Sequence, residues 1–323
     1  MHGHFDDCAE HLRPQLIMFL SVDVVGSTAF KQKFQNYGAR ADSDEREWFS
    51  VIQGFYIRTV QSFLLRWSGA CADPKFAGSC GAAPLLWKTI GDEIVFRKAV
   101  GDYRQVAKTL RCWIDAMAEV RAFLQHCDPQ LDVKCTAWMG EFPVQNKIVI
   151  APTHEVAQGL DASDLRTAGR MLSERLSGPS GGAIQLDFIG PAIDIGFRLA
   201  TRSSARKFVA SIDVAFLLAL DVNGRIELFY NGMECLKGVL GGLEYPIFWI
   251  DMTGGDSIDR AEDKLIAREA CDRDDLLAFC RRFYDARSNY AVRPFIVGDA
   301  SETLDELPGW YRDQHRRVVA QYS

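Results

Sequence analysis

Long apolar runs are missing from this 323-residue sequence: none approaches the roughly 20 residues that a membrane-crossing helix needs. An excess of positive charge is missing too, because the formal net charge is −6, and this argues against a surface that coats nucleic acid. We therefore expect neither a membrane nor a nucleic acid among the partners of this protein.

Paired cysteines are also missing. The nine cysteines are scattered without a CxxC pair, and residues 1–15 are polar and acidic, without the apolar core of a signal peptide. These features predict reduced thiols in a cytoplasmic protein, not a disulfide framework or a zinc site. His2 and His4 are expected in a flexible tail, not at a metal site.

What the sequence does contain is material for a large core. Hydrophobic residues make up 48% and aromatic residues 11% of the chain, which is typical of a well-packed protein with one large core and an appendage. The expected parts are a flexible N-terminus at 1–14, a main domain at 15–252 with a loop insertion at 68–84, and a C-terminal helical extension at 253–323.

The spacing of apolar residues predicts strand, helix, hairpin, helix and strand over the first 140 residues. The expected elements are a strand at 16–25, helices at 29–37 and 44–67, hairpin strands at 85–90 and 94–96, a helix at 103–125 and a strand at 132–140. This order is typical of a ferredoxin-like α+β fold, in which helices cover one face of a mixed sheet.

The second half continues the alternation and then becomes helical and charged. We expect helices at 165–176 and 192–201, strands at 183–189, 207–211, 226–230 and 245–251, and charged helices within 259–284 and 303–322. Opposite charges four residues apart in the last two segments are typical of a solvated helix face.

Two aspartates interrupt apolar strand segments. Asp23 lies within LIMFLSVDVVGST at 16–28, and Asp92 lies within LLWKTIGDEIVF at 85–96. Burying an unpaired carboxylate costs several kcal/mol, so such positions favour a bound cation. Two such carboxylates on neighbouring strands can hold two divalent metals roughly 3.5–4 Å apart. The alternative is a helix-capping Asp and a turn Asp, both common.

Residues beside these aspartates extend the hypothesis. Gly26, Ser27 and Thr28 follow Asp23 at a strand-to-helix junction, where backbone N–H groups suit phosphate, although an ordinary helix cap has the same pattern. Glu93 follows Asp92 on a strand and is expected to point to the opposite face as a bystander.

Lys88 stands four residues before Asp92, so both side chains share one face of a strand. It forms either a simple ion pair or a contact to substrate. Further along, LDFIGPAIDIGFRLATR places Asp187 at the end of a strand, and Asp194 and Arg198 one helical turn apart. This segment is either a helix-surface ion pair or a second half-site.

The order D-x-x-G-S-T, K-x-x-G-D, then D-x-x-G-x-x-x-D-x-x-x-R resembles the class III nucleotidyl cyclases over roughly residues 15–252. The resemblance implies the ferredoxin-like α+β catalytic domain of that family, followed here by a C-terminal helical extension. It also implies a homodimer with two composite active sites, each binding a nucleoside triphosphate (NTP) and two divalent cations, Mn²⁺ or Mg²⁺.

Residue roles follow from the same resemblance. Asp23, Asp92 and the backbone carbonyl of Val24 would hold the metals, and Lys88 with Asp187 would read the base. Arg198 would stabilise the transition state, and Asp194 stands where the family usually has an Asn that orients the ribose. The phosphate contacts would come from Gly26, Ser27, Thr28 and, in the hairpin Leu236-Lys237-Gly238, Lys237.

The architecture, with no receptor or sensor module before the catalytic core, is similar to the stand-alone pyrimidine cyclases of Pycsar antiphage systems. That similarity implies cyclic UMP or cyclic CMP as product and a downstream effector that senses it. UTP is the expected substrate, with CTP or ATP as alternatives. A diguanylate cyclase fits less well, because Ile90 replaces the first glycine of a GGDEF hairpin. The non-enzymatic alternative is a degenerate nucleotide-binding module.

Overall fold

The computed structural model describes residues 5, 7–34, 48–73, 80–152, 164–177, 184–299 and 301–322. The strands form a seven-stranded sheet in the order β2-β3-β1-β4-β7-β9-β8 and a two-stranded sheet of β5 and β6. The strand bounds are β1 Gln15–Val25, β2 Leu85–Ile90, β3 Glu93–Val100, β4 Asp132–Phe142, β5 Lys147–Pro152, β6 Ile184–Ile189, β7 Lys207–Ala210, β8 Phe229–Cys235 and β9 Glu244–Asp251.

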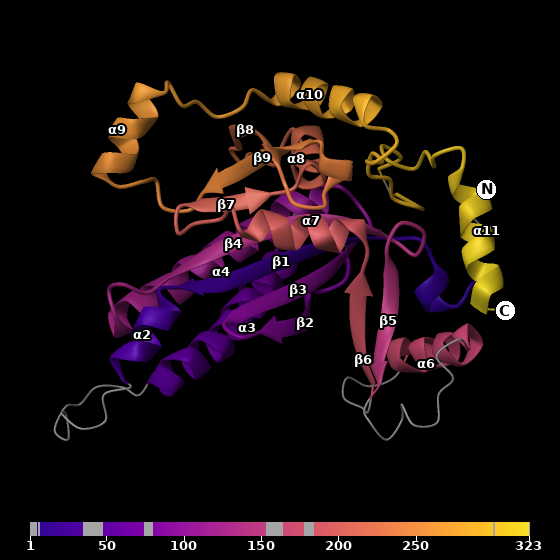
Figure 1. Cartoon of the computed structure of the whole chain (residues 1–323), viewed down its shortest axis with the longest axis horizontal. Coiled ribbons are helices and arrows are strands. Elements are labelled where there is room, and N and C mark those ends of the chain that lie inside the picture. The colour runs from indigo at the N-terminus through magenta and orange to yellow at the C-terminus, as the bar shows by residue number, and fades with distance from the viewer. Residues whose placement is uncertain are drawn as a thin grey trace.

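The helices are distributed along the whole chain (Figure 1). Their bounds are η1 Glu10–Leu12, α2 Ser27–Lys33, α3 Trp48–Ala72, α4 Arg104–Cys127, α6 Leu165–Ser177, α7 Pro191–Ala200, α8 Ile212–Leu220, η3 Leu240–Gly242, α9 Ser257–Leu265, α10 Arg273–Ala286 and α11 Tyr311–Tyr322.

Strand β1 lies in the interior of the sheet and is apolar on both faces over most of its length. It pairs antiparallel with β3 on one side and with β4 on the other. Successive side chains of a strand point to opposite faces, so Met18 and Leu20 join one core cluster while Ile17 and Phe19 join another. A strand buried on both sides cannot slip by one residue without exchanging the two cores, and its register is therefore fixed.

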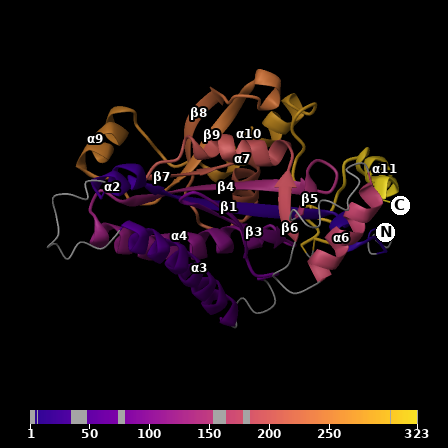
Figure 2. The same cartoon turned by 60° about the horizontal axis from the view of Figure 1, so that its bottom comes forward.

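The two faces of the sheet are covered differently (Figure 2). Helices α3 and α4 pack against one face, where the rings of Phe63, Phe96 and Trp113 meet edge to face. The other face is covered by α7 and by the β5–β6 hairpin with α6, and its core contains Phe19, Trp138 and Phe188 among others. This second face carries the candidate site residues Asp23, Lys88 and Asp187.

The predicted α+β class with a mixed sheet is confirmed. Strands β1 to β4 and the helices between them form the expected ferredoxin-like unit, and β4 and β7 are parallel neighbours in an otherwise antiparallel sheet. Among the described strands and α-helices, β5 and α8 were not predicted from the sequence. Helix α8 is almost entirely buried, so its nine residues are nearly all apolar and show no 3.6-residue period.

Several predicted boundaries differ from the structure. Helix α3 continues to Ala72 and so takes the first residues of the expected 68–84 insertion, of which residues 74–79 lie outside the described residues. The expected strand at 226–230 begins at Phe229, and the helix expected within 303–322 begins at Tyr311. The N-terminus was expected to be flexible, but Phe5 and Leu12 are buried, and the Leu12 carbonyl oxygen lies 2.7 Å from Nε2 of His315.

The C-terminal extension wraps around the main domain (Figure 1). Helix α10 packs on α8, where the Tyr284 hydroxyl donates a 2.7 Å hydrogen bond to Asp213. Helix α11 reaches α6 and the N-terminal segment. The charged helical segment expected at 259–284 consists of two helices, α9 and α10, separated by residues 266–272. No described helix is long and apolar enough to cross a membrane.

One arginine joins several segments at the end of the sheet where β1 finishes. Arg121 of α4 donates hydrogen bonds to the Asp132 carboxylate at 2.5 Å, to the Ala205 carbonyl oxygen at 2.6 Å and to the Met252 carbonyl oxygen at 3.2 Å. Its guanidinium therefore joins the start of β4 to the segments that precede β7 and follow β9.

Candidate functional site

A row of charged side chains crosses the sheet where β1 ends. Asp23 faces Glu93 on β3 and Lys134 on β4 in the strand register, so all three lie on the same face. The Lys134 ammonium is 2.8 Å from the Asp23 carboxylate. Asp23 is thus held by a cation of the chain itself, and its side chain remains partly accessible at 30%.

Asp92 lies beside this row in the β2–β3 turn. Gly91 adopts a φ of 63°, the left-handed conformation that a tight hairpin turn requires, and its carbonyl oxygen accepts a hydrogen bond from the Tyr56 hydroxyl of α3. Nζ of Lys31 on α2 is 3.7 Å from the Asp92 carboxylate. Because Asp92 precedes the residue that pairs with Asp23, the register brings the two predicted metal ligands to one end of the sheet.

Glu93 is a member of this row, contrary to the expectation that it is a bystander. Burial raises the pKa of its carboxyl group, and the negative charge of Asp23 raises it further, while a hydrogen bond from Ser21 acts in the opposite direction. Its Oε1 is buried and has no hydrogen-bond partner among the described residues. A buried carboxyl oxygen without a hydrogen-bond partner can accept a hydrogen bond from a further donor or coordinate a cation.

The turn after β1 depends on a glycine. Gly26 has a φ of 80°, and a Cβ added there would lie 2.6 Å from the Gln130 carbonyl oxygen, so the position excludes a side chain. Ser27 is buried at the start of α2, whereas Thr28 is exposed. The chain therefore passes closely against the β4 side before α2 begins.

Lys88 and Asp187 are brought together from strands 99 positions apart in the sequence. The Lys88 ammonium donates a 2.9 Å hydrogen bond to the Asp187 carboxylate. It also lies 4.1 Å from the Trp87 ring centroid and 5.6 Å from that of Phe197 on α7. The two residues that the resemblance assigns to the base thus contact each other, among aromatic rings on the same face as Asp23, and their role in reading a base stays a prediction.

Helix α7 is held tightly on this face and carries Asp194 and Arg198. A Cβ on Gly196 would lie 2.2 Å from the Trp138 ring, and one on Gly190 would lie 2.4 Å from Oδ1 of Asn146, so both glycines permit close approach. Asp194 and Arg198 are exposed and form no ion pair with each other or with Asp23 within the described part of the chain. The predicted helix-surface ion pair is therefore not found.

Lys237 lies away from the aspartates. It is exposed in the turn that joins β8 to β9. The register of β9 against β7, and of β7 against β4, places that turn at the end of the sheet opposite Asp23. Within one chain, Lys237 therefore does not reach the site that Asp23 and Asp92 begin.

The donor set at Asp23 and Asp92 fits a divalent cation that arrives with substrate. Across the described ranges, no group of three or more His, Cys, Asp or Glu residues is arranged to hold a metal ion on its own. Mg²⁺ is commonly bound by one or two carboxylates together with water and substrate phosphates, not by an all-protein cage. The unpartnered Oε1 of Glu93 is consistent with such a partly completed site.

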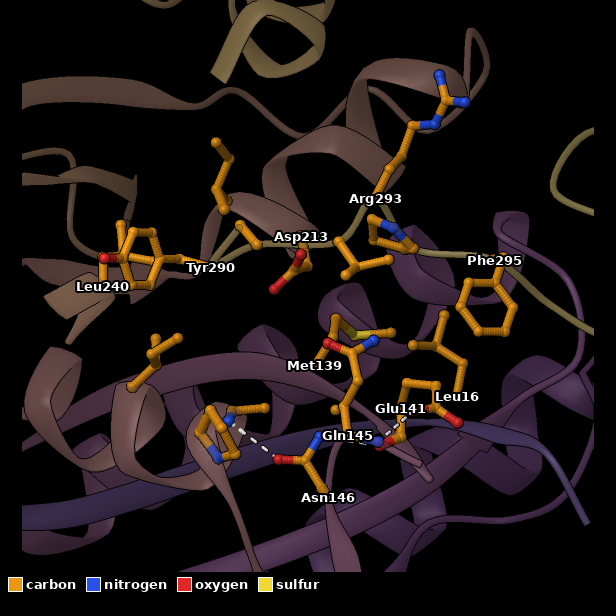
Figure 3. Close-up of a pocket in the computed structure, with 18 of the residues that line it drawn as sticks. Leu16, Met139, Glu141, Gln145, Asn146, Asp213, Leu240, Tyr290, Arg293 and Phe295 are labelled. Atoms are coloured by element: carbon orange, nitrogen blue, oxygen red, sulfur yellow. Dashed lines mark hydrogen bonds between the residues drawn. The ribbon is translucent and has the colours of Figure 1, made fainter. Parts of the chain in front are cut away.

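A cavity lies where the C-terminal extension crosses the start of α7 (Figure 3). Its volume is about 70 Å³, and Asp213, Gln145 and Tyr290 are among its walls. The Asp213 carboxylate points into it, whereas Arg293 points away (Figure 3). Burial raises the pKa of Asp213 to about 6, although the hydrogen bond from Tyr284 lowers this pKa in part.

Sequence reasoning missed Lys31 and Lys134, which neutralise the two aspartates. Lys134 lies in a segment that alternates apolar and polar residues, Val133-Lys134-Cys135-Thr136. That alternation could have assigned it to one face of the strand, but only the register shows that Asp23 is its neighbour.

No protein-family model matches the chain, and neither does any curated protein sequence. Solved structures do match in arrangement. The adenylyl cyclase CyaB from P. aeruginosa is similar at a TM-score of 0.47 and 12% identity, over 76% of this chain and 95% of that one. The guanylate cyclase domain of RhGC from Catenaria anguillulae, in complex with GTP, is similar at a TM-score of 0.39 and 10% identity, over 73% and 96%. For the guanylyl cyclase Cya2, the TM-score is 0.39, the identity 12% and the coverage 74% and 92%.

Proposed function

We propose that this protein is a nucleotidyl cyclase of the class III type, which converts UTP to 3′,5′-cyclic UMP and pyrophosphate as a signal in antiphage defence. The observation that carries the proposal is the gathering of two functional pairs on one face of the sheet. The two aspartates lie at the end of β1 and in the β2–β3 turn, and the Lys88–Asp187 pair lies further along the same face.

The roles follow from the chemistry of these groups. Asp23, the carbonyl of Val24 and Asp92 would hold two divalent cations, Mg²⁺ or Mn²⁺. When bound, such cations polarise phosphate oxygens and make a hydroxyl more acidic. Lys31 would release Asp92, and Lys134 would release Asp23, when the cations bind. The amides of Gly26, Ser27 and Thr28 would contact the phosphates.

In the reaction, the ribose 3′-oxygen forms a bond to the α-phosphorus while the bond from that phosphorus to the bridging oxygen breaks. Pyrophosphate leaves with the bond electrons, and the proton of the 3′-hydroxyl passes to solvent. Arg198 would neutralise charge on the transferred group, an effect typically worth orders of magnitude in rate. Because Lys237 lies at the end of the sheet opposite Asp23 in one chain, it would act, together with Arg198, on the site of a second copy in a homodimer.

Base selection rests on the Lys88–Asp187 pair. Lysine supplies donors to carbonyl oxygens, and a carboxylate accepts from an imide or amino group. Uracil presents both kinds of partner; cytosine and adenine remain the alternatives. Asp194, in place of the usual ribose-orienting amide, is expected to accept a hydrogen bond from the sugar.

The direct test incubates the purified protein with Mn²⁺ and each of ATP, GTP, CTP and UTP separately, and identifies products by chromatography and mass. Cyclic UMP is the expected main product. Cyclic CMP or cyclic AMP would keep the cyclase and change the base. Asp23→Asn and Asp92→Asn should each reduce turnover at least 100-fold, because each removes a metal-binding charge.

The non-enzymatic alternative has a distinct signature. A nucleotide-binding module would show a higher melting temperature with NTP and Mn²⁺ but form no cyclic product from any of the four nucleotides. That result would refute the proposed activity.

A further inference from the structure

Two cysteines and two lysines from four segments of the chain meet beside the end of α3, and we call them the thiol cluster. Cys71 lies in the last turn of α3, Cys80 precedes β2, Lys98 lies on β3 and Lys108 lies on α4. The Lys108 ammonium donates a 2.8 Å hydrogen bond to Sγ of Cys80, to which the Cys71 thiol is also hydrogen-bonded. No member of the thiol cluster belongs to the proposed nucleotide site.

Lys98 brings a buried cation to the thiol cluster. Only 1% of the residue is exposed, its ammonium donates a 3.2 Å hydrogen bond to Oε1 of Gln105, and it lies 4.8 Å from the Trp67 ring centroid. Burial lowers the pKa of Lys98 to about 8, whereas the negative charges of Cys71 and Cys80 act in the opposite direction. A buried ammonium is costly unless an anion lies nearby, and a cysteine thiolate supplies such an anion.

The two thiols differ in how readily they ionise. Burial acts to raise the pKa of Cys80, but the hydrogen bonds from Cys71 and Lys108 lower it. The positive charges of Lys108 and Lys98 lower it further, and the resulting pKa is below the ordinary value of 9.0. Burial and the neighbouring Cys80 raise the pKa of Cys71 to about 11, so Cys71 keeps its proton. Cys80 is therefore the nucleophile of the pair, because the thiolate is the reactive form of cysteine.

A small oxidant can approach the thiol cluster from two directions. Cys71 is partly exposed, and Lys108 lines a pocket of about 970 Å³ between α3 and α4. Hydrogen peroxide is close to water in size, so a narrow approach is sufficient. Cys235 is exposed, whereas Cys80 is buried. Exposure alone would make Cys235 react first, but reactive cysteines are those with a stabilised thiolate, which favours Cys80.

We propose that the thiol cluster is a modification site at which hydrogen peroxide oxidises Cys80 and Cys71 then joins it in a disulfide. The Cys80 thiolate forms an S–O bond while the O–O bond breaks, and the leaving hydroxide takes a proton from the Lys108 ammonium, which solvent restores. The Cys71 sulfur then forms the S–S bond while the S–O bond breaks, and the oxygen leaves as water with the Cys71 proton.

The electrons balance, because the two sulfurs lose two electrons and the peroxide is reduced to two water molecules. The geometry is also suitable. A disulfide needs Cβ atoms about 3.5–4.5 Å apart, a separation that cysteines with hydrogen-bonded thiols approach.

The test treats the reduced protein with hydrogen peroxide near neutral pH, blocks the remaining thiols and identifies tryptic peptides by mass without reductant. Trypsin cuts after Lys75, between Cys71 and Cys80, so the disulfide joins two peptides with the loss of two hydrogen atoms. This linked pair should form before Cys235 is modified. Earlier modification of Cys235, a disulfide between other cysteines or an unmodified Cys80 would overturn the proposal.

Variants of the neighbouring residues test the roles within the thiol cluster. Lys108→Met should slow oxidation of Cys80 at least about threefold, because the thiolate fraction falls about tenfold per unit of pKa and greater nucleophilicity offsets only part of this. Lys264→Met removes an exposed charge from α9 and should leave the rate unchanged. Equal rates in the two lysine variants would overturn the role of the ammonium.

Cys71→Ser gives an independent measurement should Lys108→Met fail to fold. Without the second thiol, oxidation should stop at the sulfenic acid of Cys80, which dimedone captures, and no disulfide should form. A disulfide that still forms at Cys80 would exclude Cys71 as its partner. Asp23→Asn should be oxidised at the unsubstituted rate, so the result does not depend on cyclase activity.

Discussion

At the scale of single residues, the row formed by Glu93, Asp23 and Lys134 determines how the protein responds to cations. Lys134→Met leaves two neighbouring carboxylates without their ammonium, so we expect the melting temperature without metal to fall by about 2 °C. Addition of Mn²⁺ should then raise it more than in the unsubstituted protein, because the cation replaces the lost charge. Both are measured by thermal unfolding.

The matched control is Lys33→Met. It removes the same charge from α2 and breaks a different ion pair, to Asp128. If Mn²⁺ raises the melting temperature equally in the two variants and the unsubstituted protein, Lys134 does not neutralise the carboxylates of Asp23 and Glu93.

A second residue-scale prediction concerns Asp213. Burial raises its pKa from the ordinary value of 3.8 to about 6, so the folded state favours the protonated acid. The associated stability is complete below about pH 4 and is lost as the pH rises through 6. Asp213→Asn keeps an acceptor for Tyr284 and removes the charge, and should therefore stabilise the protein by roughly 1–2 kcal/mol at pH 7.5. Urea unfolding should show that this gain disappears near pH 4; a gain independent of pH would contradict the assignment.

At the scale of elements, Gly26 sets the path from β1 into α2. Gly26→Ala must adopt a positive φ and also approach the Gln130 carbonyl oxygen, so a loss on the order of 3 kcal/mol is expected in urea unfolding. Gly254→Ala provides the control, because its φ is 71° and its Cβ would meet nothing within 4 Å. That variant should lose only about 1–2 kcal/mol. Similar losses of unfolding free energy in both variants would show that the backbone near Gln130 can move away from a Cβ at position 26 at little cost.

The elements also show what the sequence can and cannot predict. Strands β1 and β3 were found because apolar runs bounded by Gly26 and Gly91 are local signals. Asp23 and Asp92 were found because charge within such runs is conspicuous. The pairing of Asp23 with Lys134 depends on register between strands more than 100 residues apart, which no local pattern encodes. Helix α8 was missed because its nearly complete burial removes the polar half of the helical pattern.

At the scale of the whole molecule, the extension belongs to the core. Leu276, Cys280, Phe283 and Tyr284 are buried against the main domain. At roughly 1.5–3 kcal/mol for each large buried apolar side chain, their loss is comparable to the stability of a typical domain. A fragment of residues 1–252 should therefore aggregate or melt well below the full chain. An equal melting temperature would show that the main domain is independently stable.

The proposed dimer gives a second prediction at this scale. Mixing Asp23→Ala protein with Arg198→Ala protein should restore part of the cyclase activity, because one of the two composite sites in a mixed dimer is intact. Activity is measured after verifying mixed dimers with two affinity tags. No recovery in those dimers would exclude a site shared between two copies.

The contacts of Arg121 have a consequence for local unfolding. Because one guanidinium binds the carbonyl oxygens of Ala205 and Met252, the two segments cannot open separately without losing the same side chain. Proteins open in cooperative units whose amide hydrogens exchange together. The segments before β7 and after β9 should form one such unit, with hydrogen-exchange rates that respond in parallel to temperature and denaturant.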